Sequence, residues 1–248
     1  MARYEGKEAV EWVQRQLAAA GYYKGTVDGK FWEGSQASLQ VALADAAVGR
    51  NVVEVPMMKG LVKPDAFYNH IRGSLFGGKL SSSQFEGIEN KLAAMVAANW
   101  PLSWVADGLG TSFLESNQTM QPVREAYWLS ESWRKANLRY YPWYGRGDVQ
   151  LTWDYNYALA DEKLGLNGAL IAKPDLAMDP KISAQIMVKG MSQGWFTGKK
   201  LGDYLPDRIG TFEQYKQSRR IINGMDRWTD LASYCLHFQE ALVEGEYA

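Results

Sequence analysis

The chain has 248 residues, 46% of them apolar, so it can bury the core of one large domain or of a small and a medium one. A formal charge of −1 excludes an overall attraction to nucleic acid or to an anionic wall, so any such attraction must be local. The one cysteine, Cys235, excludes an intrachain disulfide and fits synthesis in a reducing cytosol.

The N-terminal segment MARYEGKEAVEWVQRQ is charged and lacks an apolar stretch, so we expect no signal peptide. No run of about 18 or more apolar residues occurs, so we expect no transmembrane helix and no stable membrane insertion. If the protein acts outside the cell, it therefore needs a separate factor for its release.

Residues 1–50 have the pattern of a small helical module. Apolar residues three and four positions apart predict an amphipathic helix, which Gly21 ends. The residues of this stripe are Val10, Val13 and Leu17. A glycine-rich loop, GYYKGTVDGK, follows, and a second helical pattern begins at Ser35. Residues 51–63 break the helical periodicity and are predicted to form a linker.

From residue 64 onward the chain is predicted to be mainly helical. Ser83–Glu86 has the pattern of a capping box, and Pro101 fits a first helical turn. Asp179 followed by proline predicts another helix start. Cys235 falls on the apolar stripe of the last helix, so we expect it to be buried in the core.

The segment Tyr140–Tyr157, YYPWYGRGDVQLTWDYNY, contains seven aromatic residues. Such rings suit a sugar, because they offer a flat face to C–H groups and their polar atoms bind hydroxyls. If residues 148–153 are extended, Gln150 and Thr152 share one face and the apolar residues between them pack on the other. This combination, with two glutamates just upstream, is typical of a carbohydrate-cleaving site.

The motifs ESNQTMQPVRE, YYPWYGRGDVQLTWDYNY, KPDLAMDP, GWFTGKKLGDY and RRIINGMD occur in this order along the chain. In this arrangement the sequence resembles the family 19 glycoside hydrolases, and most closely their bacteriophage endolysin branch. The N-terminal VEWVQRQLAAAGYYKGTVDGKF resembles the small helical peptidoglycan-binding domain. The two resemblances imply a mainly α protein with a binding module at 1–50 and a lysozyme-like α+β catalytic domain at 64–248. A short β element is expected near Asp148–Trp153.

The family resemblance implies an inverting mechanism that uses two carboxyl groups. Glu115 occupies the position of the general acid, and Glu125 that of the general base. Glu131 competes for the role of base. A structural alternative for Glu125 is a salt bridge with Arg124 or Arg139.

The same resemblance implies further site residues. Thr152 matches the hydroxyl that holds the attacking water, and Arg220 matches a basic residue paired with the acid. The positions implied in substrate binding are Tyr144, Gln150, Asn156, Asn223 and Arg220. The two histidines, His70 and His237, belong to no metal-binding motif, so no metal or organic cofactor is expected.

The sequence therefore predicts an endolysin that hydrolyses β-1,4 bonds of peptidoglycan glycan strands as a muramidase. We expect a monomer that is made in the cytoplasm of a bacterial host and has no nucleic-acid partner. One alternative is a chitinase with the same chemistry. Another is a non-catalytic wall-binding protein, in which Leu114, in place of the family's usual histidine, marks lost activity. Retention of both Glu115 and Glu125 argues against this last alternative.

Overall fold

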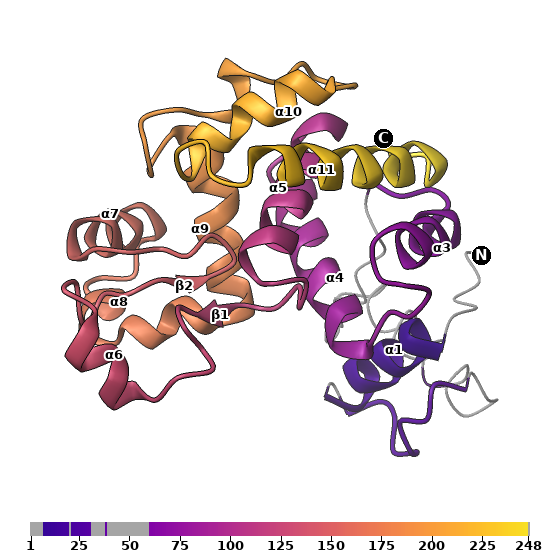
Figure 1. Cartoon of the computed structure of the whole chain (residues 1–248). Helices are drawn as coiled ribbons and strands as arrows, with labels where there is room; N and C mark the ends of the chain where they lie inside the picture. Colours follow the sequence, from indigo (N-terminus) through magenta and orange to yellow (C-terminus); the bar gives the residue numbers. More distant parts are fainter. Residues whose placement is uncertain (1–6, 20, 31–37, 39–59, 248) are drawn as a thin grey trace.

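The computed structural model describes residues 7–19, 21–30, 38 and 60–247 (Figure 1). The α-helices are α1 (Lys7–Ala19), α3 (Pro64–Ser74), α4 (Ser82–Ala97), α5 (Leu102–Glu115), α6 (Glu131–Asn137), α7 (Asp154–Leu164), α8 (Ala169–Ala172), α9 (Pro180–Gln193), α10 (Phe212–Ser218) and α11 (Trp228–Glu244). The 3-10 helices are η1 (Pro174–Met178), η2 (Leu201–Asp203) and η3 (Arg219–Ile221), and the strands are β1 (Val123–Arg124) and β2 (Arg146–Gly147). The prediction of a mainly α fold is confirmed. Within these residues, no helix is both long and apolar enough to cross a lipid bilayer.

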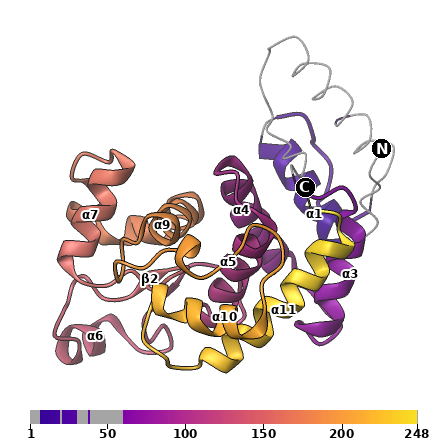
Figure 2. The same cartoon turned by 90° about the horizontal axis from the view of Figure 1, so that it is seen from above.

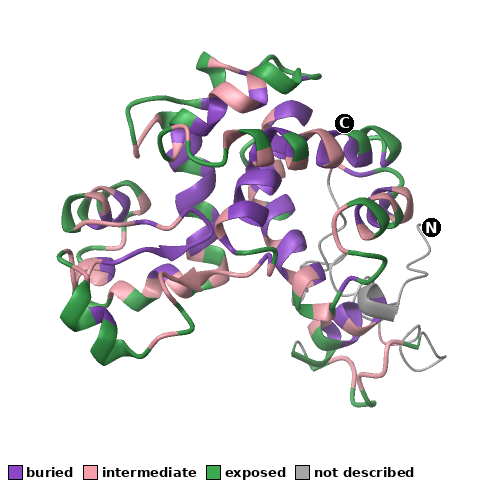
Figure 3. Ribbon diagram, viewed as in Figure 1, coloured by how far each residue is buried: buried purple, intermediate pink, exposed green. Residues whose placement is uncertain are grey.

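Helix α5 forms the centre of the core, and α11 lies against it (Figures 1 and 3). Gly110 permits this close approach, because a Cβ there would lie 2.6 Å from the sulfur of Cys235. Gly108 packs in the same way against Trp100 and Met95 on another side of α5. The predicted core position of Cys235 is confirmed, and burial raises the pKa of its thiol well above the ordinary range.

The helix starts follow ordinary capping chemistry. The Asp179 carboxylate accepts from the backbone N–H groups of Lys181 and Ile182, as a helix start there predicts. The capping box of α4 consists of Ser81 and Gln84. The predicted box at Ser83–Glu86 is therefore wrong by two residues, toward the C-terminus. Three serines in a row, at 81–83, make the sequence signal ambiguous in register.

The predicted β element is present but displaced. Strand β1 pairs antiparallel with β2, Val123 opposite Gly147. Residues 148–150 form a turn instead of an extended strand, with a positive φ of 51° at Gln150, and Leu151 returns to bridge Arg146. The predicted burial pattern nevertheless holds: the apolar residues at 149 and 151 are buried, while those at 150 and 152 are half-buried.

A buried ion pair explains why the chain turns inward after β2. Asp148 lies 2.7 Å from Lys91 of α4, and each side chain is only 1% exposed. Asp148 also accepts hydrogen bonds from Ser112 of α5 and Ser183 of α9, and Lys91 donates to the carbonyl of Met120. A buried pair is stable only when its remaining polar atoms are satisfied in this way. The cluster thus fixes the turn after β2 against three helices.

Helix α1 packs against α4. The predicted apolar stripe of α1 is buried, and the ring of Trp12 meets that of Phe85 edge-on at 6.1 Å. Gln14 holds the following loop, because its Oε1 accepts from the N–H groups of Asp28 and Gly29. The predicted helix from Ser35 and the linker at 51–63 lie largely outside the described residues, so the division into two domains stays a prediction.

Candidate active site

Glu115 is the last residue of α5, and its side chain is 16% exposed. Arg219 of η3 donates a hydrogen bond to its carboxylate, and also donates to the carbonyl of Asp226 at 2.9 Å. Arg220, the predicted partner, is exposed and donates to Gln217. The basic partner of Glu115 is therefore Arg219. One step along a 3-10 helix turns a side chain by about 120°, so the adjacent arginines of η3 point in different directions.

Leu114, beside Glu115, is only 7% exposed and belongs to the hydrophobic core. The hydroxyl of Ser116, on the other side, accepts from the backbone N–H of Met120 and so fixes the loop that leaves α5. The neighbours of Glu115 in the chain therefore supply packing and loop structure, while its own carboxylate is oriented by Arg219.

Glu125 directly follows β1, and two donors hold its carboxylate. The hydroxyl of Tyr140 lies 2.5 Å from Oε1, and the backbone N–H of Gly145 lies 2.9 Å from Oε2. Burial, and then the neighbouring Glu125 carboxylate, raise the pKa of Tyr140 to about 12, so Tyr140 remains a donor at neutral pH. Tyr140 is one of the seven aromatic residues of the segment Tyr140–Tyr157, and nothing in the sequence indicates Glu125 as its partner.

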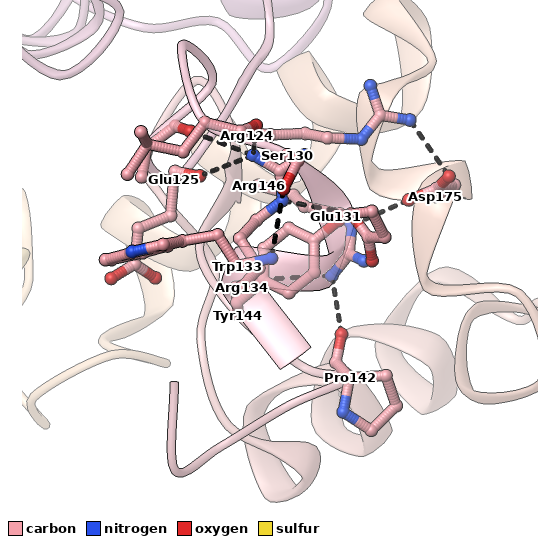
Figure 4. Close-up of polar contacts among 12 residues, drawn as sticks. Arg124, Glu125, Ser130, Glu131, Trp133, Arg134, Pro142, Tyr144, Arg146 and Asp175 are labelled. Atoms are coloured by element: carbon pink, nitrogen blue, oxygen red, sulfur yellow. Dashed lines mark hydrogen bonds and ion pairs between the residues drawn. The ribbon is translucent and has the colours of Figure 1, made fainter. Parts of the chain in front are cut away.

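The salt-bridge alternative for Glu125 does not hold among the described contacts. Arg124 pairs with Asp175 at 2.9 Å, and the guanidinium of Arg139 lies 5.0 Å from the ring centre of Trp153 (Figure 4 shows Arg124 and Asp175). Within the part of the chain that the structure describes, the Glu125 carboxylate is thus held by neutral donors and forms no ion pair with an arginine.

Gln150 lies next to Glu125. Its Nε2 donates to the carbonyl of Val123 at 2.9 Å, which orients the amide. A Cβ on Gly145 would meet Gln150 Oε1 at 2.7 Å and Glu125 Oε2 at 3.2 Å. The glycine therefore leaves the space in which the amide oxygen and the carboxylate come together, a role that only a residue without a side chain fits.

Glu131 begins α6 and is 53% exposed, but its carboxylate is engaged (Figure 4). It accepts from Arg134 at 2.9 Å and from the hydroxyl of Tyr144 at 3.0 Å. Partial burial raises the pKa of Glu131, but these hydrogen bonds outweigh that effect and lower it below the ordinary value. A carboxylate with a lowered pKa is a weaker base, so Glu125 is the better candidate.

Tyr144 does not lie where a sugar contact requires it. Its side chain is 1% exposed, and the guanidinium of Arg146 lies 3.6 Å from its ring centre (Figure 4). Because its hydroxyl donates to Glu131, the polar end is engaged as well. This burial does not support the predicted direct contact of Tyr144 with substrate, which stays a prediction; in the structure the ring packs against Arg146, next to Gly145.

The remaining predicted residues fall into two groups. Thr152 and Asn156 lie on the Glu125 side: Thr152 donates to the carbonyl of Gln150 at 2.7 Å, and Asn156 to that of Thr152 at 2.9 Å. Asn223 lies on the Glu115 side, where its backbone N–H donates a hydrogen bond to the carbonyl of Arg219 at 3.1 Å. The side chain of Asn223 is exposed and accepts from the N–H of the next residue.

Several large aromatic side chains are exposed near this region. They are Tyr127, Trp128, Trp133 and Tyr155. Trp128 is 72% exposed, and the ring of Tyr155 stacks on that of Trp153 with centroids 6.2 Å apart. Exposed flat rings of this kind suit the C–H faces of sugar rings.

A hollow of about 740 Å³ lies beside β1. Its walls include Gln121, Tyr127, Glu131 and Asp175. Neither Glu115 nor Glu125 lines it. The hollow adjoins the candidate site on the side of Glu131, and neither candidate glutamate faces it.

Comparison with known proteins gives two plant relatives. The chain is 35% identical to an endochitinase of Arabidopsis thaliana over 83 residues, which are 33% of this chain and 25% of that protein. It is 26% identical to the basic endochitinase CHB4 of Brassica napus over 176 residues, which are 67% of this chain and 61% of that protein. The chain thus spans between a quarter and about three fifths of these relatives. No protein-family model matches the chain.

Proposed function

We propose that the chain is a glycoside hydrolase that cleaves β-1,4 bonds of an amino-sugar polymer by inversion. Its acid is Glu115 and its base Glu125. The observation that carries the proposal is the different environment of the two carboxylates. Glu115 is oriented by a buried arginine, while Glu125 is held by neutral donors beside the Gln150 amide. The similarity to two proteins named endochitinases supports the same class of chemistry.

In this proposal, Glu115 protonates the oxygen of the leaving sugar, and Glu125 takes a proton from a water that attacks the other face of the ring. Inverting enzymes place these carboxyl groups about 6.5–9.5 Å apart to admit that water. Thr152 and Gln150, on the Glu125 side, are the residues we propose to hold it. The first product of a β-linked substrate is then the α-anomer, which NMR of a fresh digest identifies.

The polymer that we propose is bacterial peptidoglycan, and the biological role is that of a phage endolysin. Support comes from the N-terminal segment, which resembles a peptidoglycan-binding domain, and from the order of the motifs after residue 64. Such a protein is made in the cytoplasm of the infected host, reaches the wall through a separate release factor and lyses the cell.

Chitin is the second candidate, because both plant relatives carry the name endochitinase. Parallel digestion of purified sacculi and chitin, with mass spectrometry of the new reducing ends, separates the candidates. Reducing muramic acid supports the muramidase, and release from chitin alone supports the chitinase. If neither polymer is cleaved while the protein sediments with sacculi, the chain is a wall-binding protein and the proposal fails.

A further inference from the structure

Helices α3 and α11 pack against each other (Figures 1 and 2). At their contact the two histidines of the chain, far apart in sequence, lie close together. His70 belongs to α3, and His237 and Glu240 belong to α11. One ligand atom from each of the three side chains lies within 4.8 Å of the other two. The spacing of the two histidines in the sequence does not predict a metal site, because they meet only when α3 packs against α11 in the folded chain.

The separations suit a small divalent ion. His70 Nε2 lies 3.5 Å and His237 Nδ1 3.8 Å from the same oxygen, Glu240 Oε2. Around zinc, with metal–ligand distances of about 2.0–2.1 Å, the edge of a tetrahedron is about 3.3–3.4 Å. The side chains of His237 and Glu240 are 40% and 59% exposed, so they are free to make the small movement required. Their spacing of three residues places both on one face of α11.

A fourth residue, Glu244, orients the imidazole of His70 for metal binding. Glu244 Oε1 lies 3.0 Å from His70 Nδ1, which favours the proton on that nitrogen and leaves the lone pair on Nε2. His70 Nε2 is buried and makes no hydrogen bond within the part of the chain that the structure describes. A carboxylate behind a metal-binding histidine is the usual outer-shell arrangement, because it fixes the ring and increases its basicity.

We propose that His70, His237 and Glu240 bind one zinc ion, with water as the fourth ligand and Glu244 as a positioning residue. Two imidazoles and a carboxylate are a ligand set that zinc accepts and that calcium and magnesium disfavour. The ion joins α3 to α11, on the side of α5 away from β2 and α6 (Figures 1 and 2). Its role is to stabilise the fold, and it takes no part in the cleavage step.

The test uses the untagged full chain after treatment with a chelator and dialysis. Because the chain has two histidines, NMR of their imidazole groups reports directly on the site. Addition of ZnCl₂ at neutral pH should shift both imidazole signals together, with saturation at one equivalent. The thermal midpoint should rise with the zinc concentration, since a ligand of the folded state stabilises it. MgCl₂ at the same concentration should change neither.

Matched variants separate this site from weak surface binding. His237→Ala and Glu240→Gln should each weaken zinc affinity by about 100-fold or more, and Glu244→Gln by about 10-fold or more through loss of the outer contact. Asp230→Asn, also on α11 but paired with Arg227, is the control and should bind zinc as the wild type does. The proposal is overturned if zinc leaves the two imidazole signals of the wild type unchanged. Equal zinc affinity in wild type, His237→Ala and Glu240→Gln would also overturn it.

Discussion

Arg219 donates a hydrogen bond to Glu115 across 104 residues of sequence and joins the end of α5 to the turn that precedes α11. The arginine side chain is 3% exposed and is itself fixed by the carbonyl of Asp226. A general acid must meet the leaving oxygen at hydrogen-bond distance. The pair therefore determines the direction in which the Glu115 carboxyl points.

Arg219→Ala should lower turnover by about 10-fold to 100-fold, because the Glu115 carboxyl loses its orientation. Arg219→Lys should retain part of the activity. Arg208→Ala, an exposed arginine between η2 and α10, is the control and should stay near wild type. The measurement is the rate of reducing-end release, with thermal midpoints recorded to identify variants that unfold. Equal losses in Arg219→Ala and Arg208→Ala would contradict this assignment.

Glu125→Gln should reduce turnover more than Glu131→Gln, because Glu131 is engaged with Arg134 and Tyr144. Tyr140→Phe removes one of the two donors on Glu125 and should lower the rate by about 10-fold, with a smaller change in substrate affinity. Steady-state kinetics of the three variants on soluble glycan fragments provide the comparison. The reverse ranking of the two glutamates would make Glu131 the base.

Lys91→Met should destabilise the fold by about 3–5 kcal/mol, because it leaves the buried Asp148 carboxylate without its ion partner. The double variant Lys91→Met/Asp148→Asn should recover part of this loss, since it removes the unpaired charge. Denaturant unfolding at pH 7 measures the free energies of unfolding of Lys91→Met, Asp148→Asn and the double variant. If the double variant is as unstable as the sum of the two single variants, the Lys91–Asp148 pair is not the relevant interaction.

Glu89 should make stability depend on pH. Burial raises the pKa of Glu89 from 4.5 to about 7, although a hydrogen bond from Tyr68 lowers it in part. Because the pKa of the folded state is the higher one, the stabilising contribution is complete below about pH 4.5 and is lost as the pH rises through about 7. The free energy of unfolding of the wild type should therefore fall over this window.

Glu89→Gln should remove this part of the pH dependence, so that its stability relative to the wild type increases between pH 5 and pH 8 by on the order of 1–3 kcal/mol. Glu86→Gln, a less buried carboxyl on the same helix, is the control. Burial also raises the pKa of Asp107 to about 7, so some pH dependence of stability should persist in Glu89→Gln. A constant difference between wild type and Glu89→Gln across the window would refute the prediction.

The sequence predicts what depends on local pattern. The stripe of α1, the cap at Asp179 and the buried Cys235 follow from spacing and capping residues, and the structure has them. The motif spacing also selects Glu115 and Glu125, whose roles stay predictions.

What the sequence does not predict depends on partners far along the chain. The turn at 148–150 forms because Asp148 is bound to Lys91, a contact that no local pattern contains. Burial of Tyr144 follows from the arginines around it, and an aromatic-rich segment does not show which ring faces solvent. The approach of His70 to His237 requires the packing of α3 on α11.

The most direct test of the account compares the wild type with Glu115→Gln for the rate at which new reducing ends appear in purified sacculi. The amide retains the shape of the side chain but has no acidic proton to transfer to the leaving oxygen. We predict that Glu115→Gln lowers the rate by about 100-fold or more, while it remains folded and sediments with sacculi as the wild type does. A folded Glu115→Gln variant that degrades sacculi at close to the wild-type rate would show that Glu115 is not the acid.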